Sequence, residues 1–123
     1  MSFYTAVNCI DGRVQLPVIN YLMSRFGVKY IDSVTEPGPN LILAKKDDDE
    51  TIASIIKRIR ISVDHHKSSG IAVVGHYDCA GNPAPCEDQA EHTCEAIKTI
   101  KEAFPDIDLL GLWVDENWEV SEV

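Results

Sequence analysis

The chain has 123 residues, enough for one domain that buries a core without disulfide bonds. Hydrophobic residues make up 45% and charged residues 25%, as in ordinary soluble globular proteins, and the formal net charge is −9. This acidic balance excludes nucleic acid and membrane surfaces as expected partners, because both are anionic. No apolar run approaches the ~20 residues of a membrane span, and no signal-peptide pattern opens the chain, so we expect a cytoplasmic protein.

The first elements are predicted from a short apolar run and a periodic one. Residues 4–8 are expected to form a strand that ends in the segment 9–13 (CIDGR). Residues 14–26 predict an amphipathic helix whose apolar stripe recurs at three- and four-residue steps: Leu16, Ile19, Leu22, Met23 and Phe26. Pro17 is expected in its first turn, where a missing N–H does no harm, and Gly27 at its end.

The middle of the chain predicts a second strand and a second helix. Residues 28–34 favour a strand, and residues 35–40, with two prolines and a glycine, favour a turn. Residues 41–44 are apolar and receive no assignment. Four consecutive acidic residues then lead into a helix over residues 52–63, since carboxylates in a first turn complement the helix dipole. Gly70 is expected to end this helix.

The last third repeats the alternation of strand and helix. Residues 71–74 predict a buried strand, and residues 87–103 predict a helix with a shared apolar stripe: Ala90, Cys94, Ile97, Ile100 and Phe104. Residues 109–114 favour a fourth strand, and the acidic tail beyond could pair as a fifth, edge strand. The expected fold is therefore α/β, a single domain over residues 1–123 with a mostly parallel sheet of about four strands and helices on both faces.

Residues that commonly bind metal follow two of these strands. Cys9 comes at the end of the first strand, and His76 and Cys79 follow the third strand in a His-x-x-Cys spacing. The carboxyl ends of parallel strands meet at one edge of an open α/β sheet. Each residue alone has a structural interpretation, a small buried thiol or an imidazole bonded to backbone, but two thiols and one imidazole together favour a zinc site.

Asp11 and Arg13 offer two states for such a site. Asp11 lies two residues after Cys9 and could be the fourth ligand, whereas the planar guanidinium of Arg13 could hold its carboxylate. If Arg13 holds Asp11 away, water is the fourth ligand and becomes a nucleophile. If Asp11 coordinates, the site is closed. An ordinary ion pair that braces the loop is the structural alternative.

The remaining cysteines and tryptophans receive structural interpretations. In a reducing compartment four cysteines favour ligands, thiols or core residues over disulfides. Cys94 is expected in the core, on the apolar stripe of its helix. Cys86 is interpreted as an idle thiol or a spare ligand, and Trp113 and Trp118 as packing residues. The chain has no Cys-x-x-Cys pair, so a redox role is less favoured.

The combination of Cys-x-Asp-x-Arg with a strand followed by Gly-His-x-x-Cys-x-Gly resembles the β-class carbonic anhydrases. The flanking residues 13–14, 40–42 and 111–115 agree with the resemblance. It implies one Zn²⁺ per chain on Cys9, His76 and Cys79, and an Asp11–Arg13 dyad. The resemblance also implies reversible hydration of carbon dioxide to bicarbonate by a zinc-bound hydroxide, and a homodimer or higher homo-oligomer. Tyr77, Asp78 and His92 are proton-carrier candidates by location.

The resemblance is incomplete at three places. Only eight residues precede Cys9, so we expect neither the family's N-terminal helical arm nor its pocket glutamine. Residues 36–40 match the family's corresponding segment only at their end, and Gly12 replaces its usual small hydroxyl residue or alanine. Two other functions therefore stay open. One is zinc-dependent attack on another small electrophile, such as a sulfur analogue of carbon dioxide; the other is a non-catalytic zinc-binding or sensory domain closed by Asp11.

Overall fold

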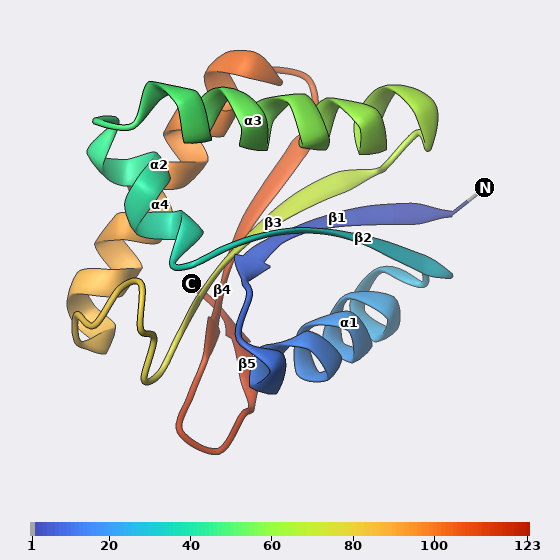
Figure 1. The fold of residues 1–123 in the computed structure, drawn as a ribbon. Helices are drawn as coiled ribbons and strands as arrows, with labels where there is room; N and C mark the ends of the chain where they lie inside the picture. The colour runs from blue at the N-terminus through green and yellow to red at the C-terminus, as the bar shows by residue number, and fades with distance from the viewer. Residues whose placement is uncertain (1) are drawn as a thin grey trace.

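The fold is a five-stranded sheet with helices on both faces, as a computed structural model describes it for residues 2–123 (Figure 1). Along the chain the elements are β1 (Phe3–Cys9), α1 (Gly12–Phe26), β2 (Tyr30–Glu36), α2 (Pro39–Lys45), α3 (Asp49–Arg60), a π-helical turn η1 (Ile61–His65), β3 (Gly70–His76), α4 (Cys86–Ala103), β4 (Asp108–Val114) and β5 (Val120–Glu122). The strand order is β2-β1-β3-β4-β5; the first four strands are parallel, and β5 is antiparallel to β4. The predicted fold class, including the fifth edge strand, is confirmed. Among residues 2–123, none of the helices has the length and apolarity needed to cross a bilayer.

Two apolar layers hold the helices on the sheet. Helices α2, α3 and α4 cover one face and α1 covers the other (Figure 1). The chain leaves β1 through α1 to reach β2 on one side, and returns through α2 and α3 to reach β3 on the other side of β1. The winding therefore reverses between β1 and β3, and the carboxyl ends of these strands form the crevice where open α/β sheets bind ligands.

Helix α1 differs from its prediction in its start and in its buried face. It begins at Gly12, so Pro17 is its sixth residue and not in the first turn. The stripe that packs against the sheet is Val14, Val18 and Leu22, which are fully buried, whereas Leu16 is 68% exposed. The helix carries apolar residues on more than one side, and periodicity alone does not tell which side the sheet will cover.

The segments around β2 and before β3 also differ from their predictions. Strand β2 begins two residues later than predicted, at Tyr30, and the unassigned residues 41–44 lie within α2. The second predicted helix ends in the π-helical turn, and Gly70 is the first residue of β3 rather than a helix end. Gly70 is required there because a Cβ at this position would overlap the ring of Tyr4.

Helix α4 buries a stripe more polar than the predicted one. Gln89, Thr93, Ala96 and Ile100 are buried at steps of three and four residues, and Cys94 is exposed. The interpretation of Cys94 as a core residue is therefore wrong. Polar side chains occupy the buried stripe because its first half packs on hydrogen-bonding groups beside the end of β3, and hydrophobicity cannot predict such a stripe.

Candidate metal centre

Cys9, His76 and Cys79 come together at one edge of the sheet. Cys9 is the last residue of β1 and His76 the last of β3, and these strands are parallel neighbours. Cys79 follows in the loop after β3. The two sulfurs and a ring nitrogen of His76 lie within 4.8 Å of one another, and all three residues are buried. The structure thus brings together the three residues that the sequence selects as ligands.

The separation of the two sulfurs suits a tetrahedral ion. Cys79 Sγ lies 3.8 Å from Cys9 Sγ. Two thiolates held tetrahedrally at ~2.3 Å from a zinc ion would also lie about 3.8 Å apart. A disulfide would bring the sulfurs to ~2.05 Å, and both cysteines are free thiols. The pair is therefore spaced as zinc ligands would be.

His76 presents one ring nitrogen to the cluster. Its Nδ1 lies 2.7 Å from the carbonyl oxygen of Tyr77, and because a carbonyl can only accept, Nδ1–H is the donor. Nε2 is then left with a lone pair, and this atom is buried with no hydrogen-bond partner among residues 2–123. An unpaired buried acceptor is costly, and a cation at the cluster would satisfy it. The donor set therefore fits a zinc ion.

Backbone N–H groups from three loops favour the charged form of the sulfurs: those of Asp11 and Gly38 act to lower the pKa of Cys9, and those of Gly81 and Asn82 act to lower that of Cys79. The thiol of Cys79 donates to the sulfur of Cys9, which lowers the pKa of Cys9 and raises that of Cys79. Burial lowers the pKa of His76, whereas the nearby Cys9 sulfur and the Tyr77 carbonyl raise it. The raising effects together are larger, so the pKa of His76 lies above its usual value. Because the three groups interact this closely, they titrate as a set rather than independently.

Asp11 is held by Arg13 beside this cluster. Arg13 donates from Nε to Asp11 Oδ1 at 3.0 Å and from Nη2 to Oδ2 at 2.7 Å, and its backbone N–H donates to Oδ1 at 2.9 Å. The last contact makes Asp11 the N-cap of α1. These hydrogen bonds, chiefly those of the Arg13 side chain, lower the pKa of Asp11 to about 2. Asp11 is thus ionised and turned toward Arg13.

Two glutamines hold the backbone beside the ligand residues in place, and the sequence did not predict either of them. Gln15 donates from Nε2 to the carbonyls of Cys9 (2.8 Å) and Asp11 (2.9 Å). Gln89 donates from Nε2 to the carbonyl of His76 (3.0 Å) and is itself 1% exposed. Neither glutamine belongs to a recognisable sequence motif. For Gln89 the available signal is a polar residue on the buried stripe of its helix, which is visible only once that stripe is known. Gln15 is half-buried beside the stripe of α1 and gives no such signal.

The loop that carries Cys79 is also held through glycines against the turn that follows β2. Gly38, at φ +64°, lies against Gly81, and a Cβ built on Gly38 would lie 2.7 Å from the Gly81 carbonyl carbon. A Cβ on Gly81 would likewise overlap the Pro37 carbonyl group and lie 2.7 Å from Gly38 N. Only two glycines permit this close approach of backbones. It fixes the loop that carries Cys79 against the turn that follows β2.

The other candidates lie outside the cluster. Tyr77 and Asp78 are exposed, and Asp78 contacts Arg13 through its carboxylate and its carbonyl. His92 Nδ1 accepts a hydrogen bond from Asn82 Nδ2 at 3.0 Å, and His92 is not part of the Cys9–His76–Cys79 group. Cys86 is exposed at the start of α4, and it is not part of the Cys9–His76–Cys79 group. Its interpretation as a spare ligand therefore gains no support.

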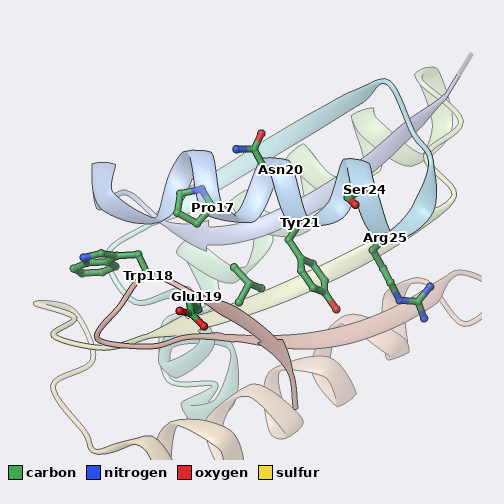
Figure 2. A pocket seen from close by; sticks show the side chains of 8 residues that line it. Pro17, Asn20, Tyr21, Ser24, Arg25, Trp118 and Glu119 are labelled. Carbon is green, nitrogen blue, oxygen red and sulfur yellow. The ribbon is translucent and has the colours of Figure 1, made fainter.

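Two clefts flank the site without including its ligand atoms. One, of about 600 Å³, borders Tyr77 and Asp78 and carries four carboxylates among its lining residues: Asp78, Glu87, Asp115 and Glu116. The other, of about 490 Å³, lies between α1 and β5, with Trp118 at the end nearest the start of α1 (Figure 2). Cys9, His76 and Cys79 line neither of these two clefts. Trp118 connects the second cleft to Arg13, because the guanidinium carbon lies 4.5 Å from the centre of its ring.

Comparison with known proteins identifies the family. The profile of a family described as "Putative carbonic anhydrase" matches residues 1–123, and the chain belongs to this family. No curated protein sequence matches the chain significantly.

Solved structures show that the fold is that of the β-carbonic anhydrases. A structure from a study of two tetrameric β-carbonic anhydrases of Sordaria macrospora superposes with a TM-score of 0.55 at 16% identity, covering 100% of this chain and 81% of that chain. The β-carbonic anhydrase CafA of Aspergillus fumigatus gives 0.53 at 13% identity, covering 99% and 74%. The β-carbonic anhydrase CcaA gives 0.55 at 15% identity, covering 99% and 80%. The resemblance drawn from the motifs is thus confirmed.

Proposed function

We propose that this chain hydrates carbon dioxide reversibly to bicarbonate, with one Zn²⁺ held by Cys9, His76 and Cys79. The observation that carries the proposal is the buried Nε2 of His76, which has no hydrogen-bond partner among residues 2–123, in a ring with a nitrogen within 4.8 Å of both sulfurs. Membership of a carbonic anhydrase family supports the same reaction. Residues 1–123 would act as a single zinc domain.

The metal would supply a nucleophile, because zinc lowers the pKa of a bound water from 15.7 to about 7. Asp11 is the group of the chain that would orient this water. Its carboxylate is ionised, with a pKa of about 2; Oδ1 accepts two hydrogen bonds from Arg13, whereas Oδ2 accepts chiefly from Nη2 and keeps a lone pair. It can therefore accept one hydrogen bond from the attacking water and fix the direction of attack.

Arg13 would decide whether the site is open. Its fork occupies both oxygens of Asp11, which favours the state in which Asp11 is a hydrogen-bond acceptor over the state in which it is a ligand. The reaction forms one C–O bond between water and carbon dioxide and releases one proton. Tyr77 and Asp78 are the exposed candidates to pass this proton to solvent, and His92 is a third by location.

We also propose a homodimer or a higher homo-oligomer in the cytoplasm. The tetrameric enzymes of Sordaria macrospora support self-association in this fold. Ile10 and Leu16, at the start of α1, are 67% and 68% exposed, and burial against a second copy would remove this apolar surface from water. A reducing compartment would keep Cys9 and Cys79 available as ligands. Sedimentation of the zinc-loaded protein, compared with Leu16→Glu, tests the association.

The function is tested by stopped-flow hydration of carbon dioxide with zinc-loaded protein over a range of pH. We expect a rate that rises with pH and falls at least tenfold in Asp11→Ala, with Arg13→Ala inactive because Asp11 is then free to ligate the metal. Lys67→Ala, a change of an exposed cation away from the site, is the matched control. A zinc-loaded protein that hydrates no carbon dioxide at alkaline pH contradicts the proposal. Turnover of carbonyl sulfide would then favour another small electrophile, and a metal closed by Asp11 would favour the non-catalytic domain.

A further inference from the structure

The guanidinium of Arg13 is contacted on three sides. Asp11 occupies Nε and Nη2, as described above. Asp78 accepts from Nη1 through Oδ2 at 3.3 Å and from Nη2 through its backbone carbonyl at 3.2 Å. The flat face of the guanidinium lies over the indole of Trp118, 4.5 Å from the ring centre. Three segments far apart in the sequence, 11–13, 78 and 118, therefore meet at one cation.

Two of these contacts come from residues with positive φ, which is common for aspartate but rare for tryptophan. Among residues 2–123, the non-glycine residues with positive φ are Lys46, Lys67, Asp78 and Trp118. Lys46 is the C-cap of α2, where left-handed geometry is common. Asp78, at φ +56°, and Trp118, at φ +60°, do not end helices, and both touch Arg13. A bulky aromatic residue at positive φ is a rare outlier, and an outlier of this kind is evidence for a function of its side chain.

The turn that holds Trp118 is well suited to a glycine. Trp118 N–H donates to the carbonyl of Asp115 at 3.0 Å, and Asp115 N–H donates to the carbonyl of Glu119 at 3.0 Å. The N–H groups of Asn117 and Glu119 donate to Asp115 Oδ1 at 2.9 and 3.0 Å, so the turn between β4 and β5 closes without any contact from the Trp118 side chain. Glycine is the residue that adopts φ +60° without steric cost. The side chain of Trp118, not the turn, therefore accounts for the residue found there. Its ring lies beside the first turns of α1 (Figure 2).

We propose that Trp118 is a positioning residue for the Asp11–Arg13 pair: its indole fixes the plane of the Arg13 guanidinium so that the fork keeps facing Asp11. The side chain of Arg13 is 47% exposed, and an exposed ion pair holds its geometry weakly by itself. An aromatic ring under the guanidinium adds a cation–π contact and removes rotamers that would turn Arg13 into solvent. The catalytic consequence rests on the proposed function, but the positioning can be measured without it.

The first experiment measures how freely Arg13 moves in the full chain. Arg13 is modified with phenylglyoxal, a reagent for guanidinium groups, and the rate is mapped by peptide mass spectrometry with and without zinc. We expect Arg13 to react about two- to fivefold faster in Trp118→Gly, the factor that an exposed cation–π contact represents. Trp118→Phe should react nearly as the wild type does. Arg25 and Arg60, which stack on Phe26 and Phe104, are internal references whose rates should not change.

Matched variants separate the ring contact from folding and strain. Lys67→Gly relieves the other positive φ outside a helix cap and should leave Arg13 unchanged. Trp118 also packs on the apolar cluster beneath α1, so Trp118→Leu retains apolar packing at the same φ but has no aromatic face. Arg13 should therefore react faster in Trp118→Leu than in Trp118→Phe. The comparison of Trp118→Leu with Trp118→Phe shows whether the aromatic ring restrains Arg13 even if Trp118→Gly does not fold.

Nuclear magnetic resonance gives a second readout. The Nε–H proton of Arg13 should lose its ring-current shift in Trp118→Gly and Trp118→Leu and keep part of it in Trp118→Phe. Unchanged phenylglyoxal rates and an unmoved Nε–H signal in both Gly and Leu variants would overturn the proposal. In hydration assays Trp118→Gly and Trp118→Leu should lower kcat with little change in KM. Trp118→Phe should have a kcat close to that of the wild type. If the wild type shows no hydration activity, the proposed function is contradicted but the positioning role of Trp118 is not. The phenylglyoxal rates and the Nε–H signal still test that role.

Discussion

Cys9 Sγ and Cys79 Sγ lie 3.8 Å apart although 70 residues separate them in the chain. They meet because β1 and β3 are parallel neighbours whose carboxyl ends lie at the same edge of the sheet. Two thiolates this close repel each other, and a cation between them would relieve that repulsion. The predictions below test whether zinc is that cation and which residues hold its surroundings in place.

Zinc content tests the ligand set directly. We expect one zinc ion per chain in the wild type, and less than about a tenth of this in Cys9→Ser, His76→Ala or Cys79→Ser after dialysis, because each change removes one of three protein ligands. Plasma mass spectrometry measures the stoichiometry. Cys86→Ser and Cys94→Ser, at exposed thiols outside the cluster, are the matched controls and should bind as the wild type does. Full zinc content in Cys9→Ser would exclude this site.

Removal of the metal should lower stability. The ligand residues are buried, and His76 Nε2 has no hydrogen-bond partner within residues 2–123, so the free energy of zinc binding, of order 10 kcal/mol, adds to the free energy of unfolding. Differential scanning calorimetry should show a lower Tm after treatment with a chelator and its recovery after zinc is added back. The chelator should not change the Tm of His76→Ala. An unchanged Tm in the wild type would mean that no metal is bound in the native protein.

The contact between Gly38 and Gly81 should tolerate no side chain. Gly81→Ala places a Cβ onto the Pro37 carbonyl group, and backbone atoms cannot move aside cheaply. We expect a loss of about 1–3 kcal/mol in the free energy of unfolding, measured in urea, and weaker zinc binding because the Cys79 loop is displaced. Gly12→Ala is the control: nothing lies within 4 Å of its Cβ, and alanine is the better helix residue. Equal stability of the two variants would count against the locked loops.

The Asp11–Arg13 pair should stabilise the fold down to low pH. Arg13 lowers the pKa of Asp11 from 3.8 to about 2, so the folded state holds this proton less tightly than the unfolded state does. The resulting stability is present above the unfolded pKa and is lost as the pH falls through about 2. Asp11→Asn keeps a capping side chain but no charge, and the stability difference from wild type should shrink as the pH falls below about 4. Urea unfolding of the two metal-free proteins measures this stability difference. A difference that does not vary with pH would contradict the stabilisation by the Asp11–Arg13 pair.

The elements were predicted more accurately than the faces they bury. Strands β1, β3 and β4 and helix α4 occur within a few residues of their expected ranges, because apolar runs and glycines act locally. The buried stripe of α1 was misassigned because Leu16 and Val14 are equally apolar, and only contact with the sheet distinguishes them. Cys94 was placed in the core for the same reason. The polar stripe of α4, with Gln89, could not be found from hydrophobicity at all.

By itself the sequence determined which donors are present, in what spacing, and that strands and helices alternate, because residue type and local periodicity are properties of the chain at short range. The sequence predicts that Cys9 and Cys79 meet, but only the tertiary structure decided their separation of 3.8 Å, the lack of a partner for Nε2 of His76 among the described residues 2–123, and the position of Trp118 over Arg13. Each of these depends on the packing of segments tens of residues apart, and such contacts arise from the register of the sheet and the close approach of loops, which no local pattern encodes.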